Sequence, residues 1–167
     1  LDQSDGGQTG VVTMAAECCE ASHVTFMARQ ARGLVSLALT EARCEQLNLP
    51  PMADPATSGA VKLSIEASTG IDTGISAADR ARTVRVAVAP DAKPSDLVQP
   101  GHVFPVATLS GGVLIRTGAA EAGVDLATLA GLTPAAVFAE VLDTHGELAD
   151  ASALVAFADA HDLSVGR

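Results

Sequence analysis

Apolar and polar positions alternate along the chain with two different periods, one helical and one typical of strands. Residues 22–32 place apolar side chains at helical spacing, with Ser22 as the expected N-cap and Gly33 as the expected stop. The short apolar run at 34–40 predicts a buried strand. A short helix is expected next, over 40–47.

The second half of the chain continues this alternation. Residues 60–68 alternate strictly between apolar and polar side chains, which predicts a half-buried strand. Ser76 followed by Asp79 resembles a capping box and predicts a helix over 76–88. The remaining pattern predicts strands at 101–108 and 135–143 and helices at 121–131 and 152–162.

Alternating strands and helices predict an α/β or α+β fold in which helices cover a sheet. The 167 residues suffice for one domain with its own core, and no linker divides them. Hydrophobic residues make up 48% of the chain, with no Trp or Tyr and four Phe, so we expect a core of small aliphatic side chains.

Charge and cysteine content limit the partners and the compartment. The formal net charge is −10 without a Lys/Arg cluster, which argues against nucleic acid and against an anionic membrane surface. No apolar run approaches the length of a membrane span. Cys18, Cys19 and Cys44 form neither a disulfide framework nor a C-x-x-C pair, so we predict a cytoplasmic protein with small thiols.

Four strings carry a more specific signal: "TGISAADRARTVR" (73–85), "KPSDLVQPGHVFPV" (93–106), "GGVLIRTG" (111–118) and "EAGVDLATLAGL" (121–132). Together they resemble the 3,4-dihydroxy-2-butanone 4-phosphate synthase family of riboflavin biosynthesis. The resemblance implies a three-layer α/β sandwich on a mixed sheet, as in YrdC-like proteins, and a homodimer with sites near the interface. It also implies that 1–167 is one such domain, trimmed at both ends.

The family converts ribulose 5-phosphate into a four-carbon ketone phosphate and formate, and the resemblance implies a magnesium ion in its site. One ligand is a glutamate in a D-R-E-x-E-G-D string. Aligned on residues 15–17, this string falls on residues 5–11. Gly6, Gly7 and Val11 then occupy the positions of its arginine, its metal-binding glutamate and its last aspartate.

The other metal ligand is the histidine of an R-x-G-H-T-E string, which falls on residues 116–121. Ala119 stands at the histidine and Ala120 at the threonine. From these departures we predict that the metal site is lost, that no cofactor is bound and that the family reaction is lost.

Other functional positions of the family are present. His102 in "GHVFP" and Glu140 in "FAEVL" match two catalytic residues, and Arg116 matches a substrate-binding arginine whose planar fork suits phosphate or carboxylate. A carboxylate in an otherwise apolar strand also favours a site role for Glu140. The substrate site is expected to include four further residues: Ser36, Thr73, Thr117 and Gly118.

Two functions from different classes follow as expectations. The first is a repurposed enzyme that uses His102 and Glu140 for metal-independent elimination, isomerisation or cyclisation of another small molecule, for example in specialised metabolism. The alternative is an inactive relative that acts as a binding or regulatory partner. Least favoured is an active synthase that makes the four-carbon riboflavin precursor, with metal ligands from Asp2 or Asp5.

Overall fold

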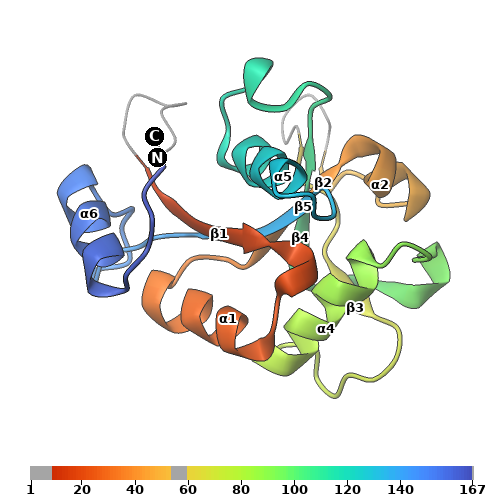
Figure 1. Ribbon diagram of the computed structural model, residues 1–167. Helices are drawn as coiled ribbons and strands as arrows, with labels where there is room; N and C mark the ends of the chain where they lie inside the picture. The colour runs from red at the N-terminus through yellow and green to blue at the C-terminus, as the bar shows by residue number, and fades with distance from the viewer. Residues whose placement is uncertain (1–8, 54–59, 167) are drawn as a thin grey trace.

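The computed structural model describes residues 9–53 and 60–166 as a mixed five-stranded sheet with helices on both faces (Figure 1). The strand order is β1-β5-β2-β4-β3. β2 and β4 are parallel, while the other neighbouring strands are antiparallel. The strands are β1 (Val11–Ala15), β2 (Ser36–Thr40), β3 (Ile65–Ala67), β4 (Leu97–Thr108) and β5 (Ala135–Glu140).

The helices form the two outer layers. Helices α1 and α4 cover one face of the sheet and α5 covers the other (Figure 1). This arrangement confirms the predicted α+β sandwich on a mixed sheet. The helices are α1 (Ala21–Phe26), continued by a π-helical turn (Met27–Ala31), then α2 (Glu41–Gln46), α4 (Ala77–Val88), α5 (Ala119–Leu129) and α6 (Ala151–Ala160).

Alternation along the strands divides the buried side chains between two cores. The larger core, on the α1 and α4 face, is built from aliphatic residues such as Leu37, Leu39 and Val137. The smaller core lies under α5 and consists of Ala38, Ala120, Val124, Ala136 and Phe138. Both cores contain mostly small aliphatic side chains, as the composition predicts.

Most predicted elements are confirmed, with shifted ends. Ser76 caps α4 by accepting the backbone N–H of Asp79 at 3.0 Å. The prediction of Ser22 as an N-cap is wrong, because Glu20 occupies that position and shares a capping box with His23. The strand predicted over 60–68 is reduced to β3, and β1 was not predicted at all.

A large bulge in β4 interrupts its pairing with β3. Ile65 pairs with Val103, yet the next residue, Glu66, pairs with Val98. Residues 99–102 of β4 therefore bulge out opposite a single step of β3. Gly101 permits this close approach, because a Cβ there would overlap the backbone of Ile65. The bulge carries His102.

Within the described ranges, none of the helices combines the length and the apolar character that crossing a bilayer requires.

Candidate functional site

His102 lies in the bulge of β4 and its ring contacts Glu66 of β3. The Nδ1 atom of His102 forms a short contact with Oε1 of Glu66. The histidine side chain is 43% exposed, whereas that of Glu66 is 15% exposed. The strand pattern places Glu66 on the polar face of residues 60–68 but does not reveal this pairing, because it depends on the bulge.

The turn before α4 closes around this pair. Gly74 has φ of +80°, and a Cβ at this position would overlap the carboxylate of Glu66. The backbone N–H of Gly74 donates to Oδ2 of the buried Asp79 at 3.0 Å. Thr73 is exposed and directly precedes Gly74, so this predicted substrate-site residue borders the His102–Glu66 pair.

Glu140 is the last residue of β5 and lies at the end of the sheet where β2 begins. Ser36, the first residue of β2, is flanked by Phe104 of β4 and Phe138 of β5. His102 and Glu140 each lie two residues beyond these phenylalanines, so alternation places both on the α5 face of the sheet, with β2 between their strands.

Glu140 is half-buried and pairs in register with Val11 of β1. Val11, which aligns with the last aspartate of the acidic string, therefore lies directly beside Glu140. The segment that leads into β2 also passes close to Glu140, because a Cβ on Gly33 would overlap the backbone of Glu140. Ser36 is buried at the same edge. Three of the predicted site residues, Ser36, His102 and Glu140, thus share one end and one face of the sheet. The catalytic roles of His102 and Glu140 and the substrate-site role of Ser36 stay predictions.

Arg116 lies elsewhere, near the end of β4. Its Nε donates to Oε1 of Glu121 at 2.9 Å, and its Nη2 donates to the carbonyl of Ala107 at 3.1 Å and also contacts Glu121. Ala107 is five residues from His102, or about 17 Å along the strand. One chain therefore holds the guanidinium well away from the His102 ring.

Glu121 is the second carboxylate that the sequence patterns do not single out. Its side chain is 1% exposed, against 38% for Arg116. Its Oε1 also accepts the backbone N–H of Leu109 at 3.2 Å, while Oε2 is buried without a hydrogen-bond partner among the described residues. A Cβ on Gly118 would come within 2.5 Å of that Oε2. Gly118 thus leaves room for the buried carboxylate.

The remaining predicted residues of the 116–121 string lie at the start of α5. Thr117 is exposed, Gly118 is the N-cap, Ala119 is half-buried and Ala120 belongs to the core under α5. Gly6 and Gly7 lie outside the described residues.

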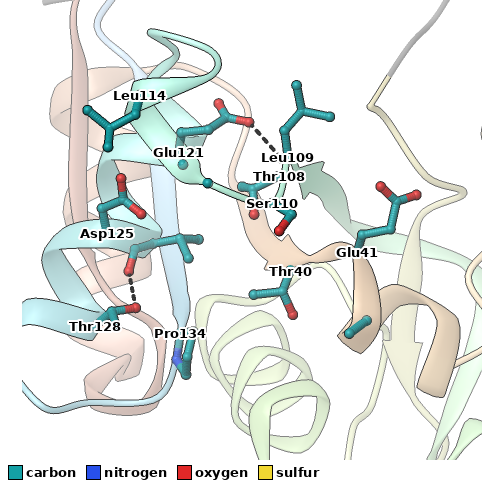
Figure 2. A pocket seen from close by; sticks show the side chains of 14 residues that line it. Thr40, Glu41, Thr108, Leu109, Ser110, Leu114, Glu121, Asp125, Thr128 and Pro134 are labelled. Carbon is teal, nitrogen blue, oxygen red and sulfur yellow. Dashed lines mark hydrogen bonds between the residues drawn. The ribbon is translucent and has the colours of Figure 1, made fainter.

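A pocket of about 540 Å³ opens where β2 and β4 end (Figure 2). Its lining combines the carboxyl groups of Glu41, Glu121 and Asp125 with the hydroxyl groups of Thr40 and Thr108. The Asp125 carboxylate is already used, because it accepts the N–H of Val113 at 2.9 Å. Neither His102 nor Glu140 contributes to this lining.

Burial makes two thiols unreactive. The pKa values of Cys19 and Cys44 are both raised to about 11, chiefly because burial disfavours the thiolate. Both are protonated at neutral pH, which supports the prediction of small buried thiols at these two positions.

Possible metal donors do not cluster in the described part of the chain. Residues 9–53 and 60–166 contain no group of three or more His, Cys, Asp or Glu side chains that could hold a metal ion. Magnesium is usually held by one or two protein carboxylates together with water and substrate, so a cluster of three protein donors is not required for it. Asp2 and Asp5 lie outside the described residues.

The sheet order and the helices on both faces define a three-layer α+β protein, in which a histidine and a carboxylate pair at the bulge between β3 and β4. The chain belongs to the 3,4-dihydroxy-2-butanone 4-phosphate synthase family, whose model matches residues 1–167. The family is an enzyme family of riboflavin biosynthesis.

Similar proteins include a 3,4-dihydroxy-2-butanone 4-phosphate synthase from Pseudomonas syringae pv. tomato, 50% identical over 99% of this chain and 46% of the relative. Riboflavin biosynthesis protein RibBA from Aquifex aeolicus is 47% identical over 99% of this chain and 42% of its own length. The chain thus spans less than half the length of these curated relatives.

Two solved structures are close to this fold. RibBX, a two-domain synthase from A. baumannii, has a TM-score of 0.91 and 47% identity, covering 98% of this chain and 49% of its own. A synthase described in complex with two magnesium ions has a TM-score of 0.93 and 36% identity, covering 99% of this chain and 84% of its own.

These similarities overturn the predicted function. The expectations of a repurposed, metal-independent enzyme and of an inactive binding partner are wrong, because identity of 45–50% to named synthases extends over the whole chain. The prediction that no cofactor is bound is also wrong for a family that includes a magnesium complex. Substitutions at a few positions, among them Gly7 and Ala119, do not outweigh 50% identity to a named synthase over 99% of the chain.

Proposed function

We propose that this chain carries the 3,4-dihydroxy-2-butanone 4-phosphate synthase activity, which converts ribulose 5-phosphate into the four-carbon ketone phosphate and formate. The observation that supports this most strongly is the 50% identity to a named synthase across 99% of the chain. The scaffold agrees, because His102 and Glu140 lie on one face at one edge of the sheet.

In this reaction the side chains move protons and hold charge. His102 and Glu140 act as acid and base during enolisation and loss of water, since both present titratable groups at the strand edge. Arg116 binds the phosphate, and Glu121 fixes the orientation of its guanidinium through Oε1. The backbone of β2, with Ser36 at its start, separates the acid from the base.

The decisive experiment measures formate released from ribulose 5-phosphate by the purified protein. We expect turnover in the presence of magnesium. EDTA, which removes the metal, should abolish turnover, and adding magnesium back should restore it. A protein that releases no formate under either condition would contradict the proposed function. Turnover that survives EDTA would contradict only the metal requirement.

We also propose that the active form is a homodimer. Its support is an apolar surface on α5 and the preceding loop, where large side chains are exposed to solvent: Leu109, Leu114, Ile115, Leu126 and Leu129. Such a surface marks an interaction site. A second chain would also compensate for the separation of Arg116 from His102 within one chain.

Light scattering after size-exclusion chromatography tests the dimer. We expect a dimer for the unchanged protein and a monomer for Leu129→Asp, because an unpaired carboxylate would be buried in the interface. The matched control is Leu163→Asp, which alters a partly exposed leucine beyond α6. A monomeric unchanged protein would contradict this proposal.

A further inference from the structure

We propose that Leu34 and Phe104 form an apolar wall between His102 and Glu140 that contacts the carbon chain of the substrate and keeps water away from it. This wall determines whether an enolised sugar phosphate goes on to lose formate or returns to a ketose. The inference rests on the proposed function. It assigns a part in the reaction to two side chains that have none in the roles proposed above.

The neighbouring core residues show on which face of the sheet the two side chains lie. Val35, in the segment that leads into β2, and Val103 of β4 are both buried in the larger core, on the α1 and α4 face. Side chains alternate along extended backbone, so Leu34 and Phe104 point to the opposite face, which α5 covers. The apolar wall therefore lies on the same face as the proposed acid and base.

The strand register places the wall between the acid and the base. Strand β2 lies between β4 and β5, and its first residue, Ser36, is opposite Phe104 of β4. Continued by two residues toward the start of the chain, the same register brings Leu34 between His102 and Glu140. Phe104 is two residues beyond His102 on β4, so its ring is the next side chain on that face.

The wall is open to solvent although it is apolar. Leu34 is 54% exposed, and Phe104 is half-buried. Within residues 9–53 and 60–166, neither hydrophobic core includes either side chain. Helix α5 packs against β5, β1 and β2 more than against β4, so it does not cover the ring of Phe104. Apolar side chains next to a few polar groups are typical of small-molecule sites, which favours the substrate as the occupant.

The proposed reaction gives such a wall a purpose. Enolisation moves a proton from a carbon of ribulose 5-phosphate to a basic side chain, and the electron pair of the broken C–H bond stays in the enediolate. On the productive path the enediolate expels a hydroxide, which takes up a proton and leaves as water. On the unproductive path a proton from solvent adds to the same carbon, which restores a ketose phosphate and releases nothing. Excluding solvent from the carbon chain suppresses the second path.

Methyl NMR tests the contact without any assay of turnover. The leucine methyl groups are labelled with carbon-13, and Leu34→Ala and Leu163→Ala assign the two signals that matter. When ribulose 5-phosphate is added together with EDTA, we expect the Leu34 signals to shift and those of Leu163, beyond α6, to stay in place. Leu34 signals that change with protein concentration but not with ribulose 5-phosphate would mean that a second chain covers the wall, and would overturn the inference.

Product analysis in deuterium oxide tests the consequence. It compares the formate released with the ketose phosphates that have gained deuterium on carbon. Phe104→Ala should lower formate release by about tenfold, while deuterium incorporation changes by less than about threefold. Leu34→Ser should change the ratio of exchange to formate in the same direction. Leu163→Ser is the matched control, since it also replaces a partly exposed leucine and should leave the ratio unchanged.

The outcomes separate this inference from the proposed function. An unchanged protein that neither releases formate nor exchanges deuterium contradicts the function, while the methyl signals still test the contact. An active protein in which Phe104→Ala and Leu34→Ser leave the ratio of exchange to formate unchanged overturns the inference alone, because a merely structural role slows both paths equally. If Phe104→Ala fails to fold, Leu34→Ser must still raise the ratio, since substitution of an exposed side chain leaves the fold intact.

Discussion

Two carboxylates of this chain each hold a basic partner, in very different surroundings. Glu66 binds a histidine in a half-open bulge between β3 and β4. Glu121 is almost completely buried and binds the permanently charged Arg116. Histidine is a side chain whose charge can change near neutral pH, whereas an arginine stays charged. The contrast suggests that loss of Glu66 costs activity and that loss of Glu121 costs stability as well.

The largest effect is expected from Glu121→Ala. The substitution leaves the N–H of Leu109 without its acceptor and leaves Arg116 with the carbonyl of Ala107 alone. We expect a loss of about 3 kcal/mol in the free energy of unfolding, at the low end of the range for a buried pair because Arg116 is partly exposed. Urea denaturation measures it, with Glu45→Ala as the control. A loss below about 1 kcal/mol would mean that Glu121, like Glu66, contributes little to stability.

His102→Gln is expected to show the opposite balance. Formate release should fall by about 100-fold, equivalent to about 2.7 kcal/mol of activation free energy. The free energy of unfolding should change by less than about 0.5 kcal/mol, because the side chain is substantially exposed. Normal turnover of this variant would contradict the expectation that His102 takes part in the reaction.

Gly101→Ala tests whether the bulge is what makes the first pair. Its methyl group would overlap the backbone of Ile65, so the two strands must separate and we expect a loss of about 2 kcal/mol together with reduced activity. Val98→Ala on the same strand is the control, as Val98 is exposed. Unfolding in urea and formate release should change together in the glycine variant only.

Ser76→Ala has the smallest expected effect. It removes the acceptor for the N–H of Asp79 and should lower the free energy of unfolding by about 1 kcal/mol. Ser164→Ala, outside any helix, serves as the control and should be neutral. If Ser76→Ala also reduced activity strongly, the start of α4 would affect the position of Glu66 as well as the stability of the helix.

Helix α4 was the element whose start the sequence predicted best, whereas the cap signal at Ser22 failed. Ser76 and Asp79 define the start of α4 because the capping contact lies within one turn. Strand β1 was overlooked because its partner β5 is more than a hundred residues away. The π-helical turn after α1 was also not predicted, since its pattern fits an ordinary helix.

The candidate site was predicted in part. His102, Glu140 and Ser36 do gather at one strand edge, although the strings that suggested them are far apart in the chain. The partners Glu66 and Glu121 were not predicted, because each contact depends on how two segments meet. The conclusions drawn from Gly7 and Ala119 failed for a related reason: substitutions at single ligand positions do not describe a whole site.

The sequence by itself determined the alternation of strands and helices, the aliphatic core and the family, since each depends on local periodicity or on strings read in order. Only the tertiary structure decided that His102 faces Glu66 and that Arg116 faces Glu121. Hydrogen bonds and ion pairs act over a few ångströms, and the bulge of β4 and the loop before α5 bring those atoms within reach.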